Sequence, residues 1–495
     1  MAEAFATEIA KSLLGKLGSC AVQEFRLAWG LEDDLARLEE RLKAINAVLS
    51  DAEKQQSKND RIRLWLHKLR EVLYDAEDVL DEIECETLRR QVVKTTGSTC
   101  RKVRRFFSSS NKIAFRLRMG HKIKSIIERL AEISSLKSEF NLSEQPIDCR
   151  HVLHEETEMN RSFENFSGLI GRDKDKERII SLLEAPSKSP NNFHQVRSIV
   201  FADSIVGPTC KTDFEKCLLE FKHLRSLELI DDAEFEAFPK MFGALKHLRY
   251  LHIGNNTKIK RLPKSIFKLQ NLQALVTGQF EELPKDVRYM ISLRFLILVT
   301  EQKQLPEGGI GCLKFLQTLL IIGCENLENL CEDMQGLRSL RKLVIAGCDS
   351  LISLPRSIKC LTILEELFIM DCEELDLMTI EEKNEEKIQP LSLRIVMFGN
   401  LPSTIALPEQ FLQGSAKSLQ TFIIEKCPNI GEMPECIGNL KKLQNLEISD
   451  CPSLSKRCIR GTGEDWPKIK HIPKIKVVDD DSSSGTPSDL TRAKE

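Results

Sequence analysis

The sequence predicts a multidomain protein in which an all-α four-helix bundle precedes an α/β solenoid. Its 495 residues exceed what one compact core supports. The first third carries apolar residues three and four positions apart, and the second half repeats one apolar pattern roughly every 24 residues. We therefore expect a helical domain at residues 1–140, a linker at 141–195, about eleven solenoid repeats at 196–458, and a tail at 459–495 that is disordered after about residue 478.

Composition and the amino terminus bear on where the protein acts. Its 72 basic and 74 acidic side chains give a formal net charge of -2, which argues against a general nucleic-acid binder. The start, MAEAFATEIAKSLLGKLG, lacks the basic residues and unbroken apolar run of a secretion signal, and no later segment approaches about 18 uncharged apolar residues. We expect a soluble cytoplasmic protein whose 16 cysteines stay reduced.

Four amphipathic stretches predict the helices of the bundle, because each places apolar residues on one face and charged residues on the other. The four stripes are Phe5, Ile9, Leu13 and Leu17; Leu31, Leu35, Leu38, Leu42, Ile45 and Leu49; Ile62, Trp65, Leu66, Leu69, Leu73, Ala76, Leu80 and Ile83; and Ile123, Ile126, Ile127, Leu130, Ile133 and Leu136. Phe5, Ile9, Leu13 and Leu17 could instead insert into a membrane, but burial in the bundle accounts for the same stripe.

The third stretch, LREVLYDAEDVLDEI at residues 69–83, resembles the EDVID-bearing helix in the coiled-coil (Rx-type) domain of plant NLR disease-resistance proteins. MAEAFATEIAKSLLGKL resembles the first helix of that domain, and the resemblance covers residues 1–140. It implies that the motif docks the bundle on leucine-rich repeats, with Leu80 in place of the usual Ile. The motif residues are Glu77, Asp78, Val79, Leu80 and Asp81. A second interpretation stays open, in which the acids are only the solvated face of an amphipathic helix.

A basic segment, RKVRRFFSSSNKIAFRLRMGHKIK at residues 101–124, interleaves Phe106, Phe107 and Phe115. Basic charge with aromatic residues can contact phospholipid or nucleic acid. Three phenylalanines do not define a stacking platform, so we expect a solvated loop followed by a basic helix face, and no nucleic-acid partner.

The second half repeats the apolar triplet L-x-x-L-x-L at intervals of 21 to 29 residues, which is the leucine-rich-repeat period. The copies start at Leu224, Leu248, Leu272, Leu293, Leu316, Leu340, Leu364, Leu393, Leu419 and Leu443. A degenerate copy at Val196, Ile199 and Phe201 brings the expected number of strands to eleven, stacked into a horseshoe.

Eight residues past the first leucine, the repeat pattern requires an inward-facing Asn or Cys. Asn256, Cys324, Cys348, Cys372, Cys427 and Cys451 occupy this position. We therefore interpret these cysteines as a structural ladder, meaning equivalent inward-facing residues of successive repeats that satisfy the turning backbone. We expect neither disulfides nor a metal site. Proline-containing segments such as LPKSI at residues 262–266 are expected on the convex side, where proline breaks any helix.

Residues between the apolar members of the triplet are expected on the concave face, and many are apolar. They are Tyr250, Phe295, Ile297, Leu320, Ile322, Val344, Phe368, Met370, Met397 and Ile423. Such a surface suggests protein binding; the alternative is that these are strand-favouring residues covered by a neighbouring domain. A basic column follows the first leucine, at Arg225, Arg249, Arg294, Arg341 and Arg394. We hypothesise that this column receives the acidic EDVID helix.

No nucleotide site is expected, although two fragments suggest one. IVGPTCKT at residues 205–212 has Ile205 and Cys210 where the Walker A pattern needs glycine. The segment beginning SGLIGRDKDKERIISLLE at residue 167 resembles the opening of the NB-ARC nucleotide switch of plant NLR proteins. By that resemblance Gly171 and Arg172 lie near its adenine pocket, but most of the switch is missing, so we expect no ADP, ATP or other cofactor.

These observations predict a non-enzymatic plant immune protein without catalytic residues, acting as a sensor fragment, decoy or modulator of full-length NLR proteins. By resemblance, the repeats would bind a pathogen effector or guarded host protein, and the bundle a host signalling protein or another NLR. Contact with the plasma membrane is expected only at its periphery and on activation. Two alternatives stay open: an ADP- or ATP-regulated NLR switch, and a leucine-rich-repeat scaffold outside immunity.

Overall fold

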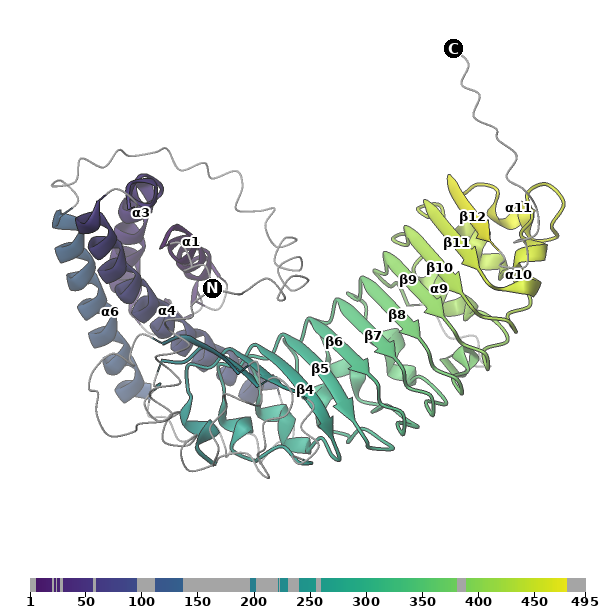
Figure 1. The fold of residues 1–495 in the computed structure, drawn as a ribbon, viewed down its shortest axis with the longest axis horizontal. Helices are drawn as coiled ribbons and strands as arrows, with labels where there is room; N and C mark the ends of the chain where they lie inside the picture. The colour runs from purple at the N-terminus through teal and green to yellow at the C-terminus, as the bar shows by residue number, and fades with distance from the viewer. Residues whose placement is uncertain are drawn as a thin grey trace, which may run out of the picture. The chain divides into compact units, whose positions relative to one another are not determined.

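The computed structural model describes residues 6–136, 196–201 and 221–478, with gaps at 20–21, 24, 27–29, 57–58, 96–111, 222, 230–239, 255–259 and 381–388. The chain divides near residue 196 into two compact units, a helical bundle and a strand-rich solenoid (Figure 1). The predicted fold class is therefore confirmed. The expected linker with Gly171 and Arg172, the Walker-like segment and the chain after residue 478 lie outside the described residues.

Four long helices make up the bundle within the described residues: α1 (Ala6–Leu17), α3 (Glu32–Gln55), α4 (Asp60–Thr95) and α6 (Lys112–Ser135). Their apolar stripes face one shared core, in which Leu13, Leu38, Leu73 and Leu130 are fully buried. Helices α1 and α6 each contact α3 and α4. Phe5, the first member of the first stripe, lies outside the described residues.

The basic segment at residues 101–124 continues into α6, which packs in this core. Phe106 and Phe107 fall outside the described residues, whereas Phe115 is 8% exposed and packs edge-on against Phe25, with ring centroids 6.2 Å apart. The one described aromatic residue of the segment is thus a core residue rather than part of a surface platform, because a base can stack only on a ring face that solvent reaches.

The solenoid is a single parallel sheet of twelve strands in sequence order (Figure 1). They are β1 (Ser198–Phe201), β2 (Ser226–Leu229), β3 (Tyr250–Ile253), β4 (Ala274–Phe280), β5 (Phe295–Thr300), β6 (Thr318–Ile322), β7 (Lys342–Ala346), β8 (Glu366–Met370), β9 (Ile395–Gly399), β10 (Thr421–Glu425), β11 (Asn445–Ser449) and β12 (Lys474–Val478). Equivalent residues of successive repeats lie opposite each other, as Thr318 and Lys342 do. This stacking of one unit on the next is the leucine-rich-repeat architecture.

Short helical turns return the chain on the other side of the sheet (Figure 1). They are η7 (Lys240–Ala244), η8 (Ile266–Lys268), η9 (Lys285–Tyr289), η10 (Ile310–Cys312), η11 (Met334–Gly336), η12 (Arg356–Cys360), η13 (Leu377–Ile380), α9 (Glu409–Gly414) and η14 (Glu435–Asn439). Prolines such as Pro284 and Pro355 directly precede several of them. Leu319 and Ile321 of β6 are buried toward these turns, so the half-buried Leu320 faces the opposite, open side.

The predicted cysteine ladder occupies the interior of the solenoid. Cys324, Cys348, Cys372, Cys427 and Cys451 are fully buried. Cys324 Sγ accepts the N–H of Thr300 at 3.3 Å, and Cys451 Sγ accepts the N–H of Cys427 at 3.3 Å. A hydrogen bond with Cys348, together with burial, raises the pKa of the Cys324 thiol far above its usual range. The buried cysteines therefore hydrogen-bond to the turning backbone, and the raised pKa values of Cys324, Cys372 and Cys427 keep these three thiols protonated. Asn256 lies outside the described residues.

The sheet is irregular between β4 and β5, where the repeat is shortest. The register shifts between Val276 and Gln279. Thr277 bridges the irregularity, because its Oγ1 donates to Ile297 O at 3.1 Å and accepts the N–H of Val299 at 3.0 Å. At Gly278 a Cβ atom would lie 2.3 Å from a backbone oxygen of the preceding repeat, so only glycine fits.

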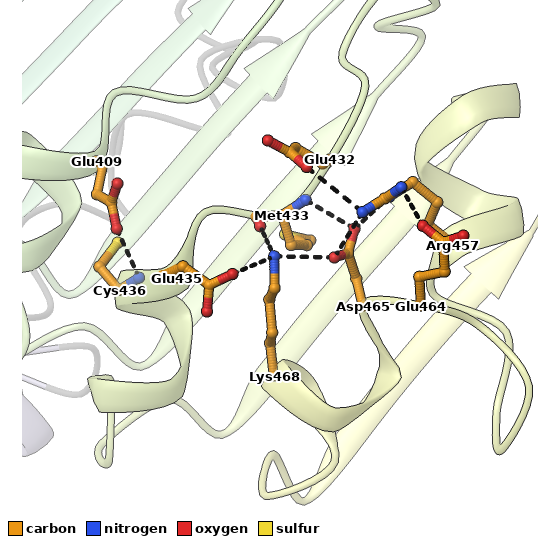
Figure 2. A network of polar contacts seen from close by, with 9 residues as sticks. All are labelled: Glu409, Glu432, Met433, Glu435, Cys436, Arg457, Glu464, Asp465 and Lys468. Carbon is orange, nitrogen blue, oxygen red and sulfur yellow. Dashed lines mark hydrogen bonds and ion pairs between the residues drawn. The ribbon is translucent and has the colours of Figure 1, made fainter.

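The carboxyl end of the solenoid is closed by α10 (Pro452–Arg457), α11 (Trp466–Ile469) and β12. Asp465, which is 1% exposed, accepts hydrogen bonds from Arg457 Nε at 2.8 Å and Met433 N at 3.0 Å (Figure 2). Lys468 Nζ lies 2.9 Å from its other oxygen. Burial alone would raise the pKa of Asp465, but these partners outweigh it and lower the pKa to about 2. The parallel sheet continues through β12, which pairs with β11.

Candidate functional site

The acidic motif lies in the middle of α4, and its residues face more than one way. Its two apolar residues are buried in the bundle core, so the leucine that replaces the usual isoleucine still packs there. Glu77 and Asp81 are one helical turn apart, and both contact Lys16 Nζ of α1, at 3.2 and 2.6 Å. Asp78 lies about 100° further round the helix than Glu77. The sequence pattern gave no indication of Lys16.

Polar contacts hold α1 in the bundle at both of its ends. At the start, Glu53 of α3 accepts hydrogen bonds from the N–H and the hydroxyl of Thr7, at 3.0 and 2.8 Å. The first N–H groups of a helix lack intrahelical acceptors, so this carboxylate acts as a cap. At the other end Lys16 contacts the acidic motif. Leu13 and Leu17 between these contacts are fully buried, as expected for a stripe that faces the bundle.

A row of residues at the strand starts contains all five arginines of the predicted basic column. This strand-start row consists of Arg197, Arg225, Arg249, Gln273, Arg294, Gln317, Arg341, Glu365, Arg394, Gln420 and Gln444. The carbonyl of each member accepts N–H groups of the next repeat, as Arg225 O accepts the N–H of Arg249 at 2.7 Å. The structure adds Arg197, so the row begins with three consecutive arginines. The sequence pattern did not reveal Arg197 as a member of the row, because the first repeat is degenerate.

The later part of the strand-start row is partly neutralised. Glu365 forms an ion pair with Arg341 and lies 3.9 Å from Arg394 on its other side. Such exposed pairs add little stability, but they reduce the positive charge of these repeats. The basic character is therefore strongest in the first three members of the row.

The predicted concave residues lie on the open face of the sheet in three neighbouring rows. The middle one, the central row, consists of Glu228, His252, Val276, Ile297, Leu320, Val344, Phe368, Met397, Ile423, Glu447 and Lys476. The candidates Ile297, Leu320 and Phe368 belong to it, Tyr250 and Phe295 precede it by two residues, and Ile322 and Met370 follow it by two. Seven consecutive members, on β4 to β10, are apolar. Val276 was not among the sequence candidates, because β4 breaks the regular pattern.

Pairs of polar side chains end the apolar part of the central row on both sides. Before it, His252 Nδ1 lies 3.0 Å from Glu228 Oε1. After it, Glu447 forms an ion pair with Lys476. Burial, followed by the charge of Glu228, raises the pKa of Tyr250 to about 12, so its hydroxyl stays protonated and able to donate. The apolar part thus has defined ends.

The residues that leave the strands form a strand-end row with positive φ angles in six successive repeats. It consists of Gly323, Gly347, Asp371, Asn400, Lys426 and Asp450, with φ from 50° to 63°. Glycine, asparagine and aspartate adopt this left-handed conformation more readily than lysine does. Asn400 Nδ2 also donates to Asp371 Oδ1 at 2.9 Å. The residue types in this row vary, so residue type alone could not have predicted it from the sequence. The only usable signal is position, because each member directly precedes the ladder position of its repeat.

Comparison with known proteins finds a family model that matches part of the bundle. Residues 9–117 match the Rx N-terminal domain, which confirms the resemblance seen in the sequence. Disease resistance protein RGA2 of Solanum bulbocastanum is 30% identical over 183 residues, covering 37% of this chain and 17% of that protein. Disease resistance RPP13-like protein 1 (putative) of Arabidopsis thaliana is 29% identical over 206 residues, covering 39% and 18%. The chain thus spans less than a fifth of the length of these relatives.

Solved structures similar to this chain include a plant receptor and a leucine-rich repeat domain. The plant peptide hormone receptor RGFR1 in complex with RGF2 has a TM-score of 0.37 and 21% identity, covering 52% of this chain and 40% of the receptor. The leucine-rich repeat domain of the type III effector XopL has a TM-score of 0.35 and 22% identity, covering 44% and 72%. These scores are low, so the repeat assignment rests on the parallel in-register strands. No helix in the described part of the chain is long and apolar enough to cross a membrane.

Proposed function

We propose that this chain is a non-enzymatic plant immune protein that works by protein contacts, as a sensor fragment, decoy or modulator of full-length NLR proteins. The Rx-type bundle and the plant disease resistance relatives support the immune role. The observation that carries protein recognition is the apolar part of the central row, because seven adjacent strands present apolar side chains on one open face. An effector or guarded host protein is the partner that this function requires.

Substitutions on the open face test this proposal in plants. Phe368→Glu places a charge in the middle of the central row, and Ile405→Glu places the same charge at a residue that is 64% exposed and outside the strands. We expect Phe368→Glu to change the defence response measured by ion leakage in leaves that also express a full-length relative. Ile405→Glu is expected to leave it unchanged. Equal responses from both variants and the unmodified chain would contradict recognition through this face.

The docking of the acidic motif on the strand-start row is part of the same proposal. Asp78 is the probe we choose, because Glu77 and Asp81 contact Lys16 of α1, whereas Asp78 lies 3.5 Å from His223, directly before the first regular repeat. We expect Asp78→Lys and Arg249→Glu each to increase the radius of gyration of the full chain in small-angle scattering, and the double variant to restore it. Glu40→Lys, at an exposed acid of α3, is the matched control. A double variant as expanded as the single ones would argue against a direct pair.

Function without a nucleotide is also proposed, since the Walker A glycines are missing from the sequence. The competing function is the ADP- or ATP-regulated switch. Purified protein is denatured, and the released nucleotide is quantified against protein by chromatography. We expect far less than one nucleotide per chain, whereas a stoichiometric amount of ADP would favour the switch.

A further inference from the structure

The central row offers a partner an apolar strip of unusual regularity. Six of its seven apolar residues from Val276 to Ile423 are half-buried and have buried neighbours on both sides along their strands, so they face away from the core; the seventh, Val344, lies in the same row but is 9% exposed. Six intervals of about 4.8 Å separate seven neighbouring strands, so the strip is about 29 Å long. A helix of about 19 residues has the same length, at 1.5 Å per residue.

Hydrogen bonding favours a helix over an extended peptide on this strip. Each strand from β4 to β10 pairs with a neighbour on both sides, so the peptide groups of the sheet are already used. An extended chain lying across the apolar side chains would leave many of its own N–H and C=O groups without partners, at a penalty for each. A helix satisfies these groups internally and presents only side chains.

Side-chain spacing gives the same preference. Successive turns of a helix are 5.4 Å apart, close to the strand spacing of about 4.8 Å. In an extended peptide, residues on one face recur every ~6.7 Å, so its side chains fall out of step with the strands after two intervals. An apolar stripe at helical spacing can therefore contact most members of the strip.

The two flanks of the strip differ in charge. On the strand-start side, Arg294, Arg341 and Arg394 are exposed, and Glu365 offsets only part of their charge. On the strand-end side of the strip, Asp371 carries a negative charge, and Glu425 is offset by Lys426, whose Nζ lies 3.6 Å from its carboxylate. A partner with acidic residues along one side of its apolar stripe complements this arrangement, and the charge also sets which way it lies.

We propose that the partner of the open face is an amphipathic α-helix of about five turns, with an apolar stripe bordered on one side by acidic residues. This inference rests on the proposed function, since it names the structure that the recognition face binds. The helix lies across the strands, with its stripe on the central row and its acidic side toward the strand-start row.

Two synthetic peptides of one composition test the inference with the full chain. Both have 20 residues drawn from Leu, Ala, Glu and Lys; one arranges the leucines at helical spacing with glutamates on one side, and the other alternates them with period two. We expect the helical peptide to bind at least about tenfold more tightly in fluorescence anisotropy and to gain helicity in circular dichroism on binding. Tighter binding of the alternating peptide would overturn the proposal of a helical partner. An absence of binding by both peptides would overturn it as well.

Variants of the chain locate the binding. Ile297→Glu and Ile423→Glu are expected to weaken binding of the helical peptide about tenfold. Ile405→Glu, the same change outside the strands, is expected to leave its binding unchanged. Arg294→Glu is expected to weaken binding of the helical peptide about threefold. Its control is Arg460→Glu, at an exposed arginine of the carboxyl-terminal cap. Arg294 is exposed and outside the core, so this variant stays informative if a central-row variant fails to fold. If none of these variants weakens binding of the helical peptide, the site assigned here is wrong.

The outcomes also separate this inference from the proposed function. If the alternating peptide binds more tightly and Ile297→Glu weakens it, the open face still recognises proteins and only the helical partner is wrong. If the plant response is insensitive to Phe368→Glu but the helical peptide binds the strip, the surface takes a helix without the immune role.

Discussion

In the helical bundle, four helices share one closed cluster of buried side chains, whereas each solenoid repeat packs mainly against its two neighbours. The bundle core combines residues from all four helices, so a loss at one position weakens contacts of every helix. The solenoid has no common centre, and its sheet grows by adding one strand to the next. We infer that the bundle unfolds as a unit and that damage in the solenoid stays near its repeat.

The largest effect is expected from a cavity in the bundle core. Leu42→Ala removes a fully buried side chain of α3 and is expected to lower the free energy of unfolding by about 2–5 kcal/mol. Hydrogen exchange should show faster exchange in all four helices and no change in β6 to β11. Leu64→Ala, at a residue that is 59% exposed, is the control. Faster exchange confined to α3 would show that the bundle is not one cooperative unit.

A smaller and local effect is expected from crowding in the solenoid. Gly278→Ala places a Cβ atom 2.3 Å from Gly254 O, and the repair of this clash should lower stability by about 1–3 kcal/mol. Exchange should increase in β3 to β5 and stay unchanged in β9 to β11. Gly431→Ala, where a Cβ meets no atom within 4 Å, should have little effect. Equal loosening of all strands would contradict the nearest-neighbour picture.

The cap at the carboxyl end gives a prediction that depends on pH. The folded-state pKa of Asp465, about 2, lies below its ordinary value of 3.8. Its carboxylate therefore stabilises the fold fully above pH 3.8, and this contribution of about 2 kcal/mol is lost as the pH falls toward 2. Asp465→Asn should lose this stability at neutral pH and flatten the pH profile between 4 and about 2, as measured by chemical denaturation. Glu464→Gln, at a 76% exposed side chain, should keep the wild-type profile.

The smallest effect is expected in the strand-end row and has the opposite sign. Lys426 has φ of 51°, a conformation that asparagine adopts with less strain. Lys426→Asn should raise the free energy of unfolding by up to about 1 kcal/mol, seen as a small increase in melting temperature. Lys442→Asn is the control at another exposed lysine. A lower melting temperature for the first variant alone would indicate that the lysine side chain has a stabilising role.

Local patterns were sufficient for the architecture. The stripes at helical spacing predicted α1, α3, α4 and α6, and the regular leucines predicted parallel strands with a cysteine ladder, because these signals repeat within one element or one repeat. The predicted concave residues, such as Leu320 and Phe368, indeed face away from the core. Their role in binding stays a prediction.

The contacts between distant residues could be decided only by the tertiary structure. Lys16 meets Glu77 and Asp81 across more than 60 residues, and Asp465 reaches Met433, 32 residues away. No periodic pattern encodes such partners. The same is true of the central row, since it depends on how each strand registers with the next, including the shift at Gly278. The sequence determined which side chains are apolar and how often they recur, while strand register determined that seven of them form one continuous strip.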